Sequence, residues 1–217
     1  MYKTRKSSNE AKQDILHAAE KLFKIHGYDK TTLQMIANEL DIAQGTLGHH
    51  FSNKYKITHE LFFNYIRELH GHVLKNMPAD CNRYQYHMTV SVCFWRDILK
   101  KNATRELFFH KHLVSIWEKD NINMAELKYR EITRDFRKDF TEEEIHMASL
   151  IEEGAQPRLY KEFIDADSAI TINQFCYYQC HMTGLLANLD EATIKRNIAR
   201  IFEIADSIPV FEGFSIE

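Results

Sequence analysis

The sequence predicts an all-α fold. Its 217 residues include only 7 glycines and 3 prolines, which leaves few positions for the tight turns of a β-sandwich or barrel. Apolar residues instead recur every three or four positions along most of the chain, as amphipathic helices require. A chain of this length is long enough for a small domain joined to a larger one.

Three short helices are predicted at the N-terminus. The first runs from about residue 9 to 26, and Gly27 is placed to end it. Thr32 is a plausible N-cap for a second helix at 33–40, and a third follows at 44–50 after a short turn. The spacing of the last two predicts a helix-turn-helix unit.

The third helix has the composition of a helix that enters a DNA groove. Its N-terminal residues Gln44, Gly45 and Thr46 are small or polar, so they keep the helix thin and offer short donors and acceptors. Lys54 stands at the start of the next helix, where an ammonium group and unpaired backbone N–H groups favour a phosphate. The pattern therefore favours binding to double-stranded DNA.

Residues 11–66 resemble the N-terminal domain of TetR-family transcriptional regulators. The matching signals are Ile15-Leu16, Leu22-Phe23, Gly27-Tyr28, Thr32, Ile36-Ala37, Gly45-Thr46-Leu47, His50-Phe51 and Lys54. The resemblance implies contacts to base edges from Gln34, Gln44, Thr46 and His49. It also implies phosphate contacts from Thr32, His50 and Lys54.

Two positions depart from the family pattern. The family usually has an aromatic residue, most often Tyr, where this chain has Gly48, and commonly a Ser or Thr N-cap where it has Ala43. A glycine inside a helix costs about 1 kcal/mol relative to alanine, and a missing cap costs about as much. An alternative therefore stays open: a dimeric ligand-binding or protein-interaction module with a weakened DNA-binding head.

Charge is distributed unevenly along the chain. Residues 1–56 carry nine Lys/Arg and six Asp/Glu, so their net charge is 9 − 6 = +3. Residues 57–217 carry 28 − 9 = 19 Lys/Arg and 31 − 6 = 25 Asp/Glu, so their net charge is −6. A basic end on an acidic body suits phosphate contact confined to that end.

We accordingly expect a DNA-binding domain at 1–56 and a helical effector-binding and dimerisation domain at 57–217. A long helix at about 54–76 joins them. Further helices are expected near 83–101, 104–119, 121–139, 142–154, 167–189 and 191–206, with polar breaks such as Asp120 between them. The run that begins at Thr141 is expected to cap its helix, because acidic residues complement a helix N-terminus.

The last two long segments are the expected homodimer interface. Residues 168–189 are apolar around most of the helix, so they need two partners. The resemblance implies that this segment and 191–206 form a four-helix bundle with a second copy. The alternative is that both are ordinary core helices.

The aromatic residues of the body suggest a cavity for a small-molecule effector. The best candidates to line it are Trp95, Phe109, His112 and Tyr177. Alternatively, each of them is an ordinary residue of the apolar core. No cofactor is expected.

Metal and enzyme functions find little support. The histidine pairs are spaced i, i+2, which places them on opposite sides of a helix. Cys176 and Cys180 are four residues apart, so they share one face of a helix. They could form a thiol or metal sensor, or they could simply be packed thiols. The chain has no phosphate-binding loop, GxSxG or HExxH motif and no 18-residue apolar run. We therefore expect a cytoplasmic, homodimeric, ligand-responsive repressor of a palindromic operator, and no enzyme.

Overall fold

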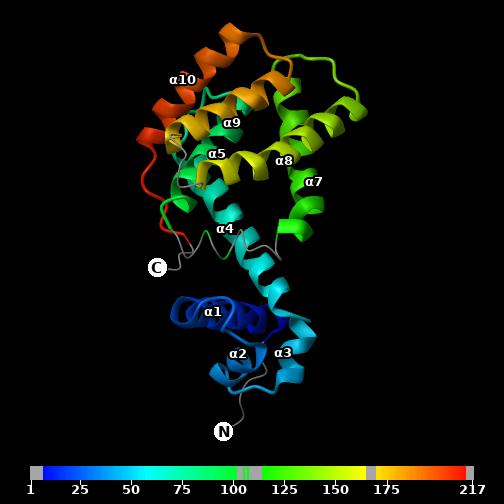
Figure 1. The fold of residues 1–217 in the computed structure, drawn as a ribbon, viewed down its shortest axis with the longest axis vertical. Coiled ribbons are helices and arrows are strands. Elements are labelled where there is room, and N and C mark those ends of the chain that lie inside the picture. The colour runs from blue at the N-terminus through cyan, green and yellow to red at the C-terminus, as the bar shows by residue number, and fades with distance from the viewer. Residues whose placement is uncertain (1–6, 102–104, 106, 108–113, 165–169, 214–217) are drawn as a thin grey trace. The chain divides into compact units, whose positions relative to one another are not determined.

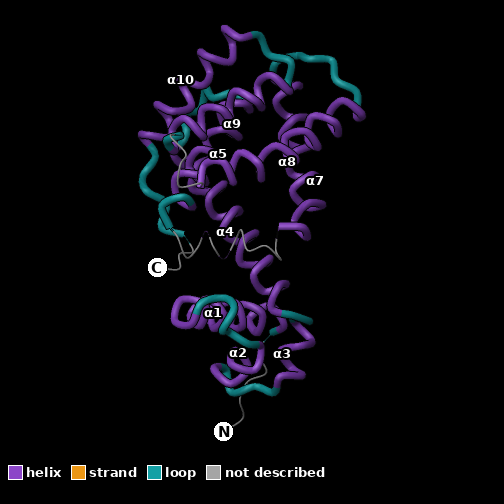
Figure 2. Tube along the Cα trace, in the orientation of Figure 1, coloured by secondary structure: helices purple, strands orange, loops and turns teal. Residues whose placement is uncertain are grey.

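The computed structural model describes residues 7–101, 105, 107, 114–164 and 170–213, with side chains left out at 114–121. Every regular element in these ranges is a helix and none is a strand (Figure 1, Figure 2), which confirms the all-α fold. The helices are α1 (Ser8–His26), α2 (Leu33–Glu39), α3 (Gln44–His50), α4 (Lys54–Asn76), α5 (Arg83–Ile98), α7 (Val114–Asp135), α8 (Glu142–Ile164), α9 (Ile172–Leu186) and α10 (Glu191–Ser207). Within the described residues, no helix is both long and apolar enough to cross a membrane.

The chain divides into two compact units. The first unit comprises the described residues up to Arg67 and those within 101–114 and 213–217, and we call its part up to Arg67 the head. The second unit comprises the described residues within 68–100 and 115–212, and we call it the body. Helix α4 contributes to both units. The predicted domain boundary between residues 56 and 57 remains a prediction.

The head has a small apolar core of α1, α2 and α3. Its fully or nearly fully buried side chains include Ile15, Leu16, Ala19, Leu22, Phe23, Ile36, Ala37, Leu47 and Phe51. Helix α1 begins at a capping box in which Ser7 and Glu10 bond each other's backbone N–H groups. It ends at Gly27, whose φ of 76° lies where glycine is favoured.

The turn between α2 and α3 is built without glycine. Asp41 adopts a left-handed φ of 53°, and its N–H donates to the Asn38 carbonyl at 3.1 Å. The next N–H, of Ile42, donates to the Ala37 carbonyl at 3.0 Å. These two bonds form a Schellman motif, which ends α2 and turns the chain into α3.

Helices α5, α9 and α10 pack together in the body (Figure 1). The Tyr84 hydroxyl donates to the Cys180 carbonyl of α9 at 2.6 Å. Gly184 lies at the tightest point, where a Cβ atom would stand 2.7 Å from Ile194 Cγ1 and 2.9 Å from the Tyr84 hydroxyl. The helices can approach this closely only because this position has no side chain.

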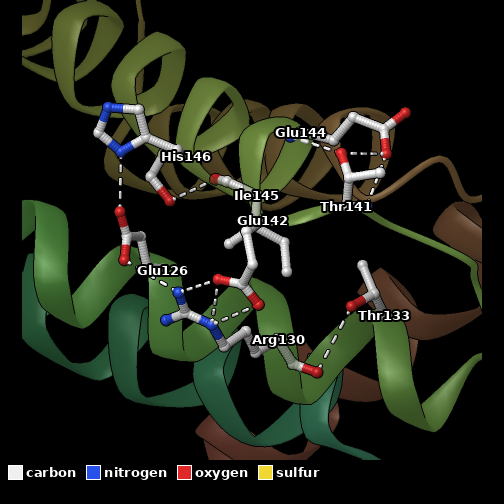
Figure 3. Close-up of polar contacts among 9 residues, drawn as sticks. Glu126, Arg130, Thr133, Thr141, Glu142, Glu144, Ile145 and His146 are labelled. Carbon is white, nitrogen blue, oxygen red and sulfur yellow. Dashed lines mark hydrogen bonds and ion pairs between the residues drawn. The ribbon is translucent and has the colours of Figure 1, made fainter.

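Helix α8 begins at the predicted cap. Thr141 and Glu144 form a reciprocal capping box, which confirms that interpretation of the acidic run (Figure 3). The Glu142 carboxylate, next to Thr141 in the chain, accepts a hydrogen bond from Arg130 of α7 at 2.5 Å. His146 lies 2.8 Å from Glu126 of the same helix. These exposed contacts fix the first two turns of α8 against α7.

Some expected helix ends are wrong. Helix α7 continues through Asp120, because an Asp inside a helix costs only a fraction of a kcal/mol when packing continues on both sides. Helix α8 runs past residue 154 and includes Pro157, although a proline there removes one backbone hydrogen bond. Helix α9 is shorter than expected, at Ile172–Leu186. The expected helix at 104–119 lies partly outside the described residues.

Replacing Gly184 by alanine tests the close packing of α9. The added methyl group would overlap Ile194 and Tyr84, so we expect Gly184→Ala to lower the free energy of unfolding by about 1–3 kcal/mol. Thermal unfolding followed by circular dichroism measures the loss. Gly154→Ala is the matched control, because no atom lies within 4 Å of the corresponding Cβ position. Equal stability of the two variants would contradict this packing.

Candidate functional site

Helix α3 presents a thin polar surface. Gln44, Gly45, Thr46, Gly48 and His49 are exposed, and of the seven residues of the helix only Leu47 is buried. Leu47 and the following Phe51 hold the helix on the core, at 0% and 3% exposure. The polar side chains therefore point away from the head, as contact with DNA requires.

Helix α3 lacks the side-chain cap that the other short helix has. Thr32 caps α2 by accepting from the Met35 N–H at 3.2 Å. Ala43 occupies the same position before α3 and makes no side-chain hydrogen bond. The first turn of α3 is held only by backbone bonds, such as Thr46 N–H to the Ala43 carbonyl at 2.9 Å.

The other candidate DNA contacts differ in exposure. Thr32 and Gln34 are exposed on α2, and the Gln34 amide donates to Asn38 one turn along at 2.7 Å. His50 is half-buried in the last turn of α3. The structure thus gathers the α2 and α3 candidates on one small unit, and their contacts with bases and phosphates remain predictions.

Lys54 is already engaged within the head. Its ammonium donates to the carbonyls of Tyr28 at 2.5 Å and Thr31 at 2.9 Å. It also stands 4.0 Å from the centre of the Tyr28 ring, within range of a cation–π contact. Burial lowers the pKa of Lys54, and nearby Asp29 partly offsets that shift. Lys54 therefore fastens the start of α4 to the loop before α2, and its predicted phosphate contact remains untested.

The sequence did not predict these contacts of Lys54 with the loop before α2. Thr31 is buried, and its hydroxyl donates to the Gly27 carbonyl at 2.8 Å, so the loop holds its carbonyls in place for Lys54. The Gly27-Tyr28 pair was the one available signal, but it does not indicate which side chain contacts the Tyr28 ring.

The four candidate effector-binding residues differ in where the structure places them. Trp95 is buried, with its ring centre 4.9 Å from that of Phe175. Tyr177 is half-buried and stacks on His181, on another face of α9 from Phe175. Phe109 and His112 lie outside the described residues.

The paired cysteines show no sign of reactivity. Burial raises the pKa of the Cys176 thiol to about 12, so the thiolate needed for redox chemistry or metal binding is disfavoured. Burial also raises the pKa of the fully enclosed Cys180. Among the described residues no group of three His, Cys, Asp or Glu side chains could hold a metal ion.

Comparison with known proteins identifies the head. Residues 15–61 match the family model for bacterial regulatory proteins of the tetR family. This segment is similar to the N-terminal domain of TetR-family regulators. The match covers α2 and α3 and parts of α1 and α4, so it includes every candidate DNA contact named above.

The chain is also similar, over part of its length, to a bacterial repressor. It is 25% identical over 113 residues to a probable acrEF/envCD operon repressor of Escherichia coli K12, and the match covers 50% of this chain and 51% of the relative. It therefore spans about half the length of that relative.

Solved structures share the fold. SmeT, the repressor of the Stenotrophomonas maltophilia multidrug efflux pump SmeDEF, aligns with a TM-score of 0.53 and 17% identity, over 82% of this chain and 91% of SmeT. A SmeT–triclosan complex aligns with a TM-score of 0.52 and 16% identity, over 81% and 90% of the two chains.

Replacing Lys54 separates its structural contacts from contact with DNA. Lys54→Met keeps the aliphatic stem but leaves the loop carbonyls without their donor, so we expect a loss of about 1 kcal/mol in stability without DNA. Thermal unfolding measures it, and the exposed neighbour Lys56→Met is the control. Unchanged stability together with weaker DNA binding would instead assign Lys54 to phosphate contact alone.

Replacing Gly48 tests whether glycine loosens α3. No atom lies within 4 Å of the position of a Cβ at residue 48, so we expect Gly48→Ala to stabilise the head by about 0.8–1 kcal/mol. Hydrogen exchange of the α3 amides measures the gain locally. Gly45→Ala, in the first turn of the same helix, is expected to give less. An unchanged exchange rate would show that Gly48 does not limit the order of α3.

Proposed function

We propose that this chain is a TetR-family, ligand-responsive transcriptional repressor. It binds a palindromic operator as a homodimer, and a small molecule in the body releases it. The observation that carries the proposal is the exposed polar surface of α3, held on a buried Leu47 and Phe51 inside a segment that matches the family model.

Relatives support the regulatory role. The Escherichia coli protein is described as a probable operon repressor, and SmeT is the repressor of an efflux pump, with triclosan bound in one structure. Two α3 helices about 34 Å apart would reach successive major grooves of an operator. An effector need only favour a conformation with a different spacing.

The proposed dimer surface centres on α9. Tyr178 and Leu185 of this helix are 53% and 54% exposed, which is unusual for large apolar side chains. The outer face of α10 is instead polar, with Lys195, Arg196 and Glu203 exposed. Gly184 packs inside its own chain, so we assign the apolar part of the interface to Tyr178 and Leu185 and its polar part to α10.

Salt-dependent binding to DNA from the gene's own upstream region tests this function. We expect the logarithm of the binding constant to fall steeply and linearly with the logarithm of salt concentration, because bound phosphates release counterions. Thr46→Ala and Gln44→Ala should each weaken specific binding by about 1–3 kcal/mol. The dimer, measured by light scattering, should persist.

Gln13→Ala, at an exposed position of α1 outside the proposed surface, is the matched control and should bind normally. Equal binding of the Thr46 and control variants would overturn the assignment of the DNA-contacting surface. A wild-type protein that shows no salt-dependent binding at all would favour the alternative, a dimeric module with a weakened head.

A further inference from the structure

One face of α9 lines the interior of the body. Phe175, Gln179 and Thr183 follow one another at four-residue intervals, and all three are buried. Helix α8 lies antiparallel to this face, because the Thr183 hydroxyl is 3.1 Å from Glu152 while the Phe175 ring centre is 5.3 Å from that of Phe163. Gln179 therefore lies between these two contacts.

The Thr183 end of this interior is polar and electrically balanced. The Glu152 carboxylate is 2% exposed and accepts from Lys128 at 2.6 Å, Tyr129 at 2.5 Å and Thr183 at 3.1 Å. Burial raises the pKa of Glu152, but Lys128 and the three hydrogen bonds outweigh it, so the group stays ionised beside a cation. The Gln156 amide adds a fourth donor at 3.3 Å.

The Phe175 end is aromatic. Trp95 of α5 has its ring centre 4.9 Å from that of Phe175 and 6.0 Å from that of Tyr160 of α8. Phe163 completes the group. Three helices thus contribute rings that would pack against a flat apolar molecule.

Gln179 lies between the two ends, and its side-chain amide nitrogen makes no hydrogen bond to the described residues. Its side chain is 2% exposed, and Nε2 has no partner among the described residues. A buried amide without a partner costs more than an ordinary hydrogen bond contributes. The Thr89 hydroxyl is also buried without a partner among the described residues. It lies about one turn from Cys93 and two turns from Arg96, on the side of α5 that binds Asp206 of α10.

We propose that the interior between α5, α8 and α9 binds an uncharged aromatic molecule with a hydrogen-bond acceptor, its ring against Trp95 and Phe175 and its acceptor on Gln179 Nε2. This inference rests on the proposed function, since it names the chemical class of the effector. Glu152 and Lys128 already neutralise each other, so a charged ligand would be left buried without a counterion. The unused group is a donor, so the ligand must supply the acceptor.

The test combines two probes and two proteins. Acetophenone has a ring and a carbonyl acceptor, and α-methylstyrene has nearly the same shape with a CH₂ group in place of the oxygen. Their affinities for the isotope-labelled full chain are measured by NMR titration. We expect the wild type to prefer the ketone by about 3- to 10-fold, the ratio that one neutral hydrogen bond supplies. In Gln179→Met this ratio should fall to about one.

Two further readouts make the result independent of the folding of one variant. The side-chain NH₂ signals of Gln179 in the wild type should move downfield with the ketone and not with the alkene. Gln156→Met, whose amide is already bonded to Glu152, should keep the preference for the ketone. Gln179→Met should itself unfold about 2–4 °C higher, because it loses an unpaired buried amide.

The inference is overturned if Gln179→Met keeps the preference, which would indicate a buried water molecule as the partner of Gln179, or if neither probe binds. Both results leave the DNA assay unaffected. If the ketone preference depends on Gln179 but the wild type fails to bind DNA, the ligand site stands and the proposed repressor function fails.

Discussion

In the part of the chain that the structure describes, three helices, α2, α7 and α9, are followed by a non-glycine residue in the left-handed backbone region. Asp41, Arg137 and Asn188 have φ values between 51° and 54°, where a side chain costs about 1–2 kcal/mol. At each end two backbone N–H groups donate back into the last turn, which offsets part of that cost. The α2–α3, α7–α8 and α9–α10 connections all begin at these residues, so the orientation of each following helix depends on them.

The body adds a second constraint, which is the burial of Glu152. Its carboxylate joins α7, α8 and α9 through Lys128, Tyr129 and Thr183. Breaking such a network by removing one partner is costly, whereas an apolar replacement of the whole network is often tolerated. The network therefore says more about which helix faces lie opposite each other than about how stable the body is.

The sequence predicted most of the head and less of the body. Helices α3 and α4 begin and end at the expected residues, because their apolar spacing and the family motifs agree. The role of Lys54 was missed, because its carbonyl partners belong to a loop 23 to 26 residues earlier and carry no side-chain signal. Gln179 was missed for a related reason. A glutamine in an apolar stretch shows its unmet hydrogen bond only when its neighbours on α8 are known.

An unpaired amide in the core of a domain is itself informative. A ligand shifts a conformational equilibrium only as far as it binds one state better than the other, and a core whose polar groups are all paired offers it little to gain. Gln179 keeps one donor unpaired beside a neutral ion pair and a group of aromatic rings. The free energy lost in the empty state is then available as differential affinity when an acceptor arrives, so the defect that lowers stability is what would make the body responsive.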